Sequence, residues 1–547
     1  MSNSVLIRNP KLHKHKFNPS RMLTLNMGQV IPNFCELANP GDIWKLSSTS
    51  LTRTMPMIAP IFGRVRIYQH YFFVPLRLLM NDFESFITGG IDGNDATPHP
   101  YIKSPSTGWE AGSLMDHLGY CTNYFNEDNT KHVVGNLKGS AFPVRAYNRV
   151  INDWYINENI EGMLRELSLE PGEDTTTDTT IFKKVWRPDY FINNLPWAQR
   201  GPEIMLPLGV SAPVYGSEGK PLSMTNTSVQ NFGTYPLVTT HVQGTGGSNS
   251  YLRPQWSGDK TINNYEWNVT PKSVGVDSNI YTDLTEASSI SVNDLRDSLA
   301  LKVASEISAR TGGRLIEWLL GHWGVRSSNK TLQRSQYLGG GVSSLFVDAV
   351  EQTSSTDNTS PQGNLSGRGT SVNNVWGFKH RFEEPGVILG LMSIMPDALY
   401  YQGQRRWLNY NSRLDYPLPA FAKLGEQETK EVEIFAQGEG SSYTASDGTV
   451  VSDDTTLGFN PRYEECRFIP SSIHANFKTN LKFWTLARHF ENPPLLNSQF
   501  MQGEPSKRVF AVTDQQYDSF LTEVGFNIKC WRKIPKHGIP TTFGLLS

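Results

Sequence analysis

The chain is poor in cysteine, in charge and in long apolar runs, and each shortage excludes a class of protein. Only four cysteines occur in 547 residues, and no two of them form a CxxC pair. They are too few and too far apart to stabilise a secreted protein through disulfide bonds. We therefore expect reduced, buried thiols in a cytosolic folding environment. The four are Cys35, Cys121, Cys466 and Cys530.

No apolar stretch is long enough to cross a bilayer, and the N-terminal MSNSVLIRNPKLHKHKF has no apolar run of signal-peptide length. We therefore expect a soluble chain that is not exported through a cleaved signal. Charged residues make up only 19% of the chain, and the formal net charge is −2. Any contact with nucleic acid must then come from a local basic surface or from a separate basic partner.

Sequence signatures of common enzymes are also missing. The chain contains no GxxxxGK[ST] phosphate loop, no GxGxxG after a strand, no HExxH and no GxSxG. His13 and His15 form a His-x-His pair, a pattern that can bind a metal, but they lie in a basic terminus outside any recognisable strand. Metal ligands need a rigid frame, so we predict no catalytic residue, no metal site and no cofactor.

Glycine, proline and aromatic residues are abundant instead. The 46 Gly and 33 Pro favour short strands joined by long loops. Aromatic residues reach 11%, which suits a β core or extended interfaces. Residues 1–21 contain no acidic residue and are predicted to form a flexible basic arm, the alternative being a solvated terminus. The basic residues of this arm are Arg8, Lys11, Lys14, Lys16 and Arg21.

Alternation of apolar and polar residues predicts several strands. One face of segment 64–74 carries Val65, Ile67, Tyr71 and Phe73, and the other carries Arg64, Arg66 and His70. Segment 523–530 alternates in the same way, with Val524, Phe526, Ile528 and Cys530 on its apolar face. The run 386–395 is apolar on both faces, as in a strand buried on both sides. Segment 431–434 alternates over a shorter span and is also predicted to be a strand.

Three helices are predicted from apolar residues at helical spacing. The second begins near Ser291, with Asp294 as its capping partner, and the third covers 314–323. We expect all three apolar stripes to face the core. The stripes of the first two helices are Tyr147, Val150, Ile151, Trp154 and Tyr155, and Leu295, Leu299, Val303 and Ile307.

The region 211–290 is rich in Gly, Ser, Thr and Asn and has little periodicity. A structureless loop of this length is abnormal inside a compact domain, so we expect an insertion with its own short strands or a surface projection. Strands with few helices, long insertions and no domain linker predict a mainly β fold. We expect a β-sandwich or jelly roll that carries elaborations.

Several segments share their order along the chain with one family. They are PVRAYNRVINDWYINENI (143–160), RPDYFINNLPWAQRGPEIMLPLG (187–209), LQRSQYLGGG (332–341), PQGNLSGRGTSV (361–372) and GVILGLMSIMPDALYYQG (386–403). Together they resemble the major capsid proteins of microviruses, in the gokushovirus branch of single-stranded DNA bacteriophages. The signature residues are Tyr190, Phe191, Leu195, Pro196, Trp197, Gln199, Gly201, Pro202, Gln333, Tyr337, Leu338, Gly339, Gly340, Gly341, Pro361, Gln362, Gly363 and Asn364. The ending IPKHGIPTTFGL matches only partly, with His537 where the family commonly has Tyr.

The resemblance implies a single eight-stranded jelly roll, of which sixty copies close a T = 1 icosahedral shell around circular single-stranded DNA. Residues 22–210 and 291–547 then form the jelly-roll core, with helical insertions in the first part and a C-terminal arm in the second. Residues 211–290 fall where such proteins carry an insertion that projects at the threefold axes and contacts the host. The implied location is the virion, assembled in the bacterial cytoplasm.

The implied partners are a DNA pilot protein, an internal scaffolding protein, a small basic DNA-packaging protein and a host-cell surface receptor. We expect the basic arm 1–21 to face inward and neutralise phosphates. We expect the Pro-rich segments 17–32 and 492–498 to lie across neighbouring copies. Two alternatives remain open: a carbohydrate-binding or glycan-cleaving β protein, and a nucleic-acid enzyme that uses His13 and His15.

Overall fold

The computed structural model describes residues 11–536 with gaps. The residues outside the description are 1–10, 92–93, 203, 205–213, 217–228, 233–234, 239, 243–249, 253–279, 283–291, 312–313, 327, 330, 352–364, 446–447, 515–516 and 537–547. The chain divides into two compact units, one formed by residues 1–200 and 305–547 and the other by residues 201–304.

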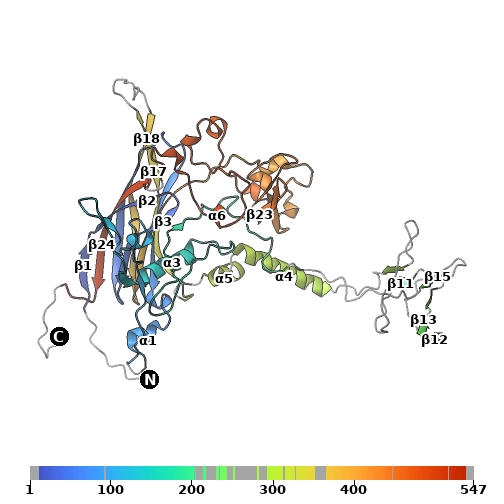
Figure 1. Cartoon of the computed structure of the whole chain (residues 1–547), viewed down its shortest axis with the longest axis horizontal. Helices are drawn as coiled ribbons and strands as arrows, with labels where there is room; N and C mark the ends of the chain where they lie inside the picture. Colours follow the sequence, from blue (N-terminus) through green and yellow to red (C-terminus); the bar gives the residue numbers. More distant parts are fainter. Residues whose placement is uncertain are drawn as a thin grey trace. The chain divides into compact units, whose positions relative to one another are not determined.

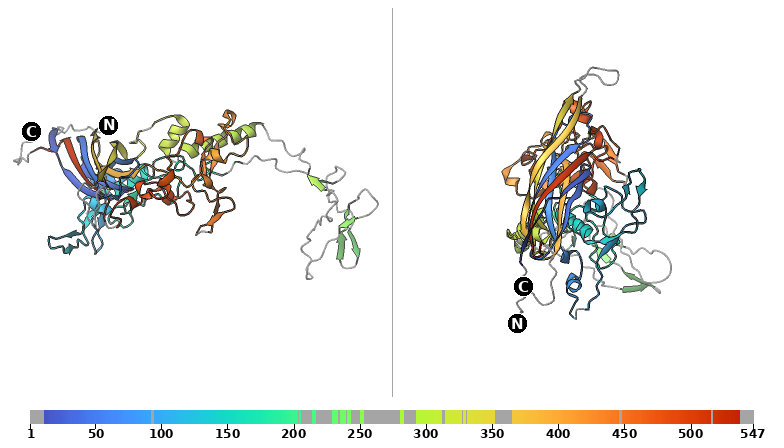
Figure 2. Two further views of the ribbon diagram at one scale, coloured as in Figure 1. Left: turned by 90° about the horizontal axis from the view of Figure 1, so that it is seen from above. Right: turned by 90° about the vertical axis from the view of Figure 1, so that its left-hand side faces the viewer.

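The larger unit is built on one antiparallel sheet of ten strands (Figure 1). The strands are β1 His13–Phe17, β2 Ser20–Leu25, β3 Gln29–Ala38, β4 Ile43–Thr54, β5 Val65–Pro75, β10 Phe182–Lys183, β17 Gln336–Glu351, β18 Leu365–Arg381, β19 Gly386–Pro396 and β24 Phe520–Arg532. Their order is β1-β24-β4-β18-β17-β5-β19-β3-β10, and β2 pairs with β24 beside β1. The first strands and the last strand therefore lie side by side, as the blue and red strands of Figure 2 show.

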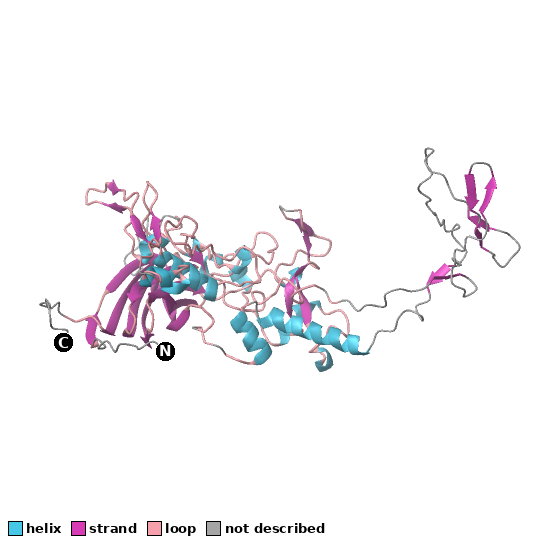
Figure 3. Cartoon of the chain, turned by 90° about the horizontal axis from the view of Figure 1, so that it is seen from below, coloured by secondary structure: helices cyan, strands magenta, loops and turns pink. Residues whose placement is uncertain are grey.

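Short hairpins and helices complete the larger unit, in which strands and loops predominate (Figure 3). The hairpins pair β6 Tyr101–Lys103 with β9 Lys138–Ser140, β7 Tyr124–Phe125 with β8 Lys131–His132, β20 Glu426–Lys430 with β23 Thr456–Pro461, and β21 Ser442–Thr444 with β22 Val450–Ser452. The α-helices among the described residues are α1 Phe83–Thr88, α2 Leu114–Leu118, α3 Phe142–Trp154, α4 Val292–Thr311, α5 Leu315–Trp323 and α6 Ser498–Met501.

The smaller unit contains three short strand pairs among its described residues. They are β11 Val214–Gly216 with β16 Ile280–Thr282, β12 Val229–Phe232 with β13 Tyr235–Val238, and β14 Thr240–Val242 with β15 Ser250–Leu252. The short strands expected within 211–290 are therefore present. The expected role of this region as a projection stays a prediction.

One hydrophobic core fills the space between the two halves of the main sheet. It takes Trp44 and Leu46 from β4, Phe526 from β24, and Ile67 and Tyr71 from β5. In β4 and β24, buried residues alternate with more exposed ones, because one face of each strand packs on this core. The mainly β sandwich, consistent with a jelly roll, is therefore confirmed. The count of eight strands is not confirmed, since the main sheet has ten.

A second core lies on the opposite face of β5 and β19. All residues of β19 are buried, as its two apolar faces predicted, because Ile388 packs in the first core and Leu389 in the second. The helix α3 covers this second face with Tyr147, Val150 and Ile151, so the stripe predicted for the first helix is confirmed.

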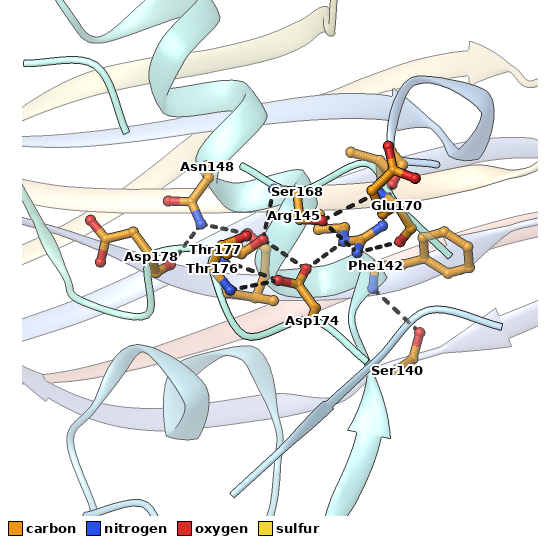
Figure 4. A network of polar contacts seen from close by, with 12 residues as sticks. Ser140, Phe142, Arg145, Asn148, Ser168, Glu170, Asp174, Thr176, Thr177 and Asp178 are labelled. Atoms are coloured by element: carbon orange, nitrogen blue, oxygen red, sulfur yellow. Dashed lines mark hydrogen bonds and ion pairs between the residues drawn. The ribbon is translucent and has the colours of Figure 1, made fainter. Parts of the chain in front are cut away.

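A buried ion pair fixes α3 to the loop that follows it (Figure 4). Arg145 Nε donates to Asp174 Oδ2 at 2.7 Å, and the other guanidinium nitrogens donate to the carbonyl oxygens of Leu79 and Glu170 at 2.9 and 2.8 Å. Both charged side chains are 0% exposed. Burial raises the pKa of Asp174, but hydrogen bonds from Thr177 and Arg145 outweigh it, so that the pKa lies below its usual value.

Two local predictions are wrong, and a third is not tested by the structure of one chain. Segment 431–434 is not a strand: Glu431–Glu433 is a 3-10 turn, which Lys430 N caps by donating to Glu433 Oε1 at 3.0 Å. An alternation of four residues is too short to separate a strand from a turn. Residues 17–32 contribute to β1, β2 and β3 of the chain's own sheet, and their expected position across a neighbouring copy stays a prediction. All four cysteines are free, but Cys121 and Cys466 are exposed.

Candidate interaction surfaces

The predicted basic arm is part of the main sheet from residue 13 onward. Lys14 pairs with Trp531, and Lys16 pairs with Lys529. The Lys14 ammonium also lies 5.6 Å from the centre of the Trp531 ring. The expectation of a flexible arm is therefore wrong for residues 13–21, because the edge of β24 offers backbone groups that pair with them.

The structure brings together only some of the predicted genome-facing residues. Lys14 and Lys16 share the outward face of β1, and Lys11 is exposed just before it. Arg21 pairs with the buried Val524 and faces the other way, and its guanidinium donates to the His117 carbonyl oxygen at 3.1 Å. Arg8 lies outside the described residues.

Three further lysines continue the basic surface and were not singled out from the sequence. Lys16 on β1 pairs with Lys529 on β24, Lys529 pairs with Lys45 on β4, and Lys45 pairs with Lys379 on β18. Directly paired residues point to the same face of a sheet. The alternation within β24 signals an outward Lys529, but no single strand reveals that four lysines align across four strands.

His13 and His15 lie in β1, contrary to the expectation that they fall outside any strand. As in the rest of the arm, this segment is ordered by its pairing with β24. His15 Nε2 lies 3.0 Å from the carbonyl oxygen of Ile534. Within the described ranges, no group of three or more His, Cys, Asp or Glu side chains is arranged to hold a metal ion.

The helices α4 and α5 form where they were predicted, but the apolar stripes predicted for them do not face the core. In α4, Leu299 and Val303 are 57% and 54% exposed. In α5, Leu315 and Trp323 are 59% and 68% exposed, and none of its nine residues, all of which are described, is buried. Helical periodicity predicts an apolar stripe but not what covers it. Exposed apolar surface of this extent is typical of protein–protein contact sites.

Comparison with known proteins identifies the family. A family model described as "Capsid protein (F protein)" matches residues 7–542. The chain belongs to this capsid-protein family. It is 33% identical to capsid protein VP1 of Chlamydia phage 1, over 94% of this chain and 93% of the relative. It is 31% identical to capsid protein VP1 of Bdellovibrio phage phiMH2K, over 98% and 97%, and 29% identical to that of Spiroplasma virus 4, over 87% and 85%.

The chain is thus a capsid protein of the virion, similar to those of gokushovirus-like microviruses. The resemblance seen in the sequence is confirmed. Membership in a structural family implies a non-enzymatic role. Among the helices in the described part of this capsid protein, none is long and apolar enough to span a membrane.

The first signature segment of the capsid protein forms a buried polar cluster. The Tyr190 hydroxyl donates to Glu433 Oε2 at 2.7 Å, and the Tyr400 hydroxyl donates to Asp189 Oδ2 at 2.6 Å. Asp189 Oδ1 also accepts the backbone N–H groups of Phe191 and Ile192. Burial raises the pKa of Asp189 despite these bonds. These residues therefore join segments of the fold that are distant in the sequence.

The rest of that segment is held by backbone contacts. Leu195 and Phe459 exchange two backbone hydrogen bonds, at 2.9 and 2.8 Å. Gly201 has φ of +100°, a left-handed conformation that favours glycine. The remaining signature positions differ in burial: Gln199 is buried, Trp197 partly buried, and Pro196 and Pro202 exposed.

The second signature segment leads into β17. Gln333 adopts a left-handed conformation with φ of 54°, and the Tyr337 ring packs 5.5 Å from that of Phe72. Gly340 lies so close to the Gln69 carbonyl oxygen that no side chain fits there. The other members of this segment are Leu338, Gly339 and Gly341, of which the two glycines pair with β5. The third segment, Pro361, Gln362, Gly363 and Asn364, lies outside the described residues.

Glu431 is a buried carboxyl group of the capsid protein whose titration should affect its stability. It is 1% exposed, and burial together with the nearby Asp453 carboxylate raises its pKa to about 8. Among the described residues, its Oε1 has no hydrogen-bond partner. Its neighbour Glu433, by contrast, accepts hydrogen bonds from Tyr190, Arg406 and Lys430 N.

The substitution Glu431→Gln is expected to increase the free energy of unfolding at pH 8 by about 2–4 kcal/mol. The folded pKa lies above the unfolded value of about 4.3, so wild-type stability falls as pH rises from about 4 to about 8. Glutamine does not titrate and removes this loss. Urea unfolding of the unassembled protein at several pH values measures the effect. Glu433→Gln is the matched control and should destabilise, and an unchanged pH dependence in Glu431→Gln would contradict the assignment.

Proposed function

We propose that sixty copies of this capsid protein close a T = 1 icosahedral shell around circular single-stranded DNA and that the chain has no enzymatic activity. Wedge-shaped β-sandwiches present different edges to their neighbours, and repetition of such contacts about rotation axes closes a particle. The observation that carries the proposal is the family match over residues 7–542.

The exposed helix α5 supports an assembly role. Leu315, Trp318, Leu320 and Trp323 all lie at the surface of the single chain. An apolar helix face is rarely left in water, and tryptophan is typical of interface anchors. We therefore propose that a neighbouring copy covers α5 in the shell.

The outward basic residues Lys11, Lys14 and Lys16 support contact with the genome, as first expected for the arm. A chain of net charge −2 cannot balance the charge of a whole genome. We therefore propose that a small basic DNA-packaging protein neutralises most of the genome's charge. The DNA pilot protein and the internal scaffolding protein are the other proposed partners. The region 211–290 is proposed to meet a host-cell receptor.

The substitutions Lys11→Gln and Lys14→Gln together should lower the DNA content per particle without preventing particle formation. Each removes one cation that would neutralise a phosphate, while the backbone pairing of β1 with β24 is kept. Deleting residues 1–21 is a poorer test because it removes β1. The ratio of absorbance at 260 and 280 nm of purified particles reports DNA content. A wild-type ratio would refute the role of the arm.

Sedimentation of the expressed protein, alone and with the other phage proteins, tests the shell itself. The proposal expects rapidly sedimenting closed particles that protect DNA from nuclease. The alternative of a carbohydrate-binding or glycan-cleaving protein expects a stable single molecule that binds sugars. Metal-dependent nicking lost on His13→Ala would instead support the nucleic-acid enzyme.

A further inference from the structure

Charge is distributed very unevenly over the edge half of the main sheet. The strands β1, β2, β4, β18 and β24 contain ten Lys or Arg residues and a single acidic residue, Glu523. The whole chain has a net charge of −2, so the remaining residues carry −11. The basic strands are therefore a local feature and do not follow from composition.

Most of these cations point to the outward face of the sheet. Arg21 and Arg532 point inward, and Arg532 pairs with Asp42 at 2.8 Å. The outward set is Lys14, Lys16, Lys45, Arg53, Arg368, Lys379, Arg381 and Lys529. Four of them, which we call the lysine row, are directly paired across neighbouring strands: Lys16, Lys529, Lys45 and Lys379.

In the described part of the chain, no carboxylate neutralises the positive charge of the lysine row. Neighbouring strands lie about 4.8 Å apart, so the row spans about 14 Å. On the same face of β24, Glu523 lies six residues from Lys529, which is about 20 Å along the strand. Like charges opposite each other destabilise a sheet, so an anion above the row would stabilise it.

We propose that the lysine row and the adjacent Trp531 form a binding track for the sugar–phosphate backbone and bases of single-stranded nucleic acid. The track deepens the proposed enclosure of DNA and rests on it. Lys16 and Lys529 would contact phosphates on one side of the track, and Lys45 and Lys379 on the other.

Trp531 favours nucleic acid over an acidic protein. It lies on the outward face of β24, two residues after Lys529. It pairs with Lys14 on β1 on one side and with Ile43 on β4 on the other. Lysines that bind phosphates beside an aromatic ring that stacks on bases are typical of single-strand binding surfaces. A basic peptide is repelled from this face, so the basic DNA-packaging partner must bind elsewhere.

The test compares a full-length double variant, which carries both Lys45→Gln and Lys379→Gln, with the wild type. Binding of an oligothymidine is measured by fluorescence anisotropy over a range of salt concentrations. Each phosphate contact in a single strand contributes about −0.7 to the slope of log affinity against log salt. Raising the salt from about 50 to about 200 mM weakens binding in both proteins. The fold-loss of affinity should be about seven-fold smaller for the double variant than for the wild type. Its thermal midpoint without DNA should not fall, because the change relieves repulsion.

Lys103→Gln with Lys423→Gln is the matched control, since both lysines are exposed and lie outside the row. It should leave the salt dependence unchanged. Trp531→Leu should lower affinity about ten-fold with an unchanged slope, as expected from the loss of one stacking contact. An unchanged slope in the Lys45 and Lys379 variant would overturn the track. Equal binding of polyglutamate, with the same loss in the variants, would overturn the assignment to nucleic acid.

These outcomes are separable from those of the shell proposal. If wild-type particles form but the slope does not change, only the track is wrong. If the wild-type chain never forms particles, the shell proposal fails, while binding of oligothymidine by the row is still measured on the single chain.

Discussion

Replacing Arg145 with Met is expected to lower the free energy of unfolding of the unassembled capsid protein by about 3–5 kcal/mol. The substitution leaves the Asp174 carboxylate buried without its cation, and it leaves the carbonyl oxygens of Leu79 and Glu170 without donors. A buried charge that loses its partner is far more costly than an exposed one. Urea unfolding at neutral pH measures the difference.

Two further variants make this prediction specific. Arg149→Met lies four residues along the same helix, where the ion pair with Asp153 is partly exposed, and should cost less than about 1 kcal/mol. Adding Asp174→Asn to Arg145→Met removes the unpaired charge and should restore part of the loss. The cost of Arg145→Met should also shrink as pH falls, because protonation neutralises Asp174. A cost equal to that of Arg149→Met would contradict the role of the buried pair.

Combining Leu315→Glu with Trp323→Glu is expected to abolish particle formation while the chain still folds. Both side chains are exposed in the single chain, so the free energy of unfolding should change by no more than about 0.5 kcal/mol. Placing carboxylates in a dry interface costs about 2–4 kcal/mol for each anchor, and a shell repeats that cost in every copy. Sedimentation of the co-expressed phage proteins reports particles, and urea unfolding reports the fold.

The control for this pair is Leu164→Glu. Leu164 is an apolar residue that is 74% exposed, and scattered residues of this kind are normal on protein surfaces. Particles should form normally with this variant. Normal particles with the α5 variant as well would show that no neighbouring copy covers that helix.

The sequence predicted the parts of the fold that local periodicity determines. In β5, Val65, Ile67, Tyr71 and Phe73 all enter the core, as their alternation indicated. The burial of both faces of β19 and the apolar stripe of α3 were also predicted correctly from the spacing of apolar residues. In each case the pattern is long enough to distinguish a period of two from a period of 3.6.

Features set by contacts between distant segments could not be predicted. Segment 13–21 joins the sheet only because β24, some 500 residues later, offers its edge. The alignment of Lys16, Lys529 and Lys45 depends on strand register, which no single segment encodes. The outward position of the apolar residues of α5 follows from what surrounds the helix. Helical spacing is the same whether the chain's own core or another molecule covers the apolar residues.

Particle mass tests the central claim most directly. Sixty copies of a 61.4 kDa chain amount to about 3.7 MDa before DNA is added. Mass photometry of the purified wild-type protein, expressed with its companion phage proteins, should give a discrete species at or above that value. A protein that stays at the mass of one or a few chains under all such conditions would contradict the account.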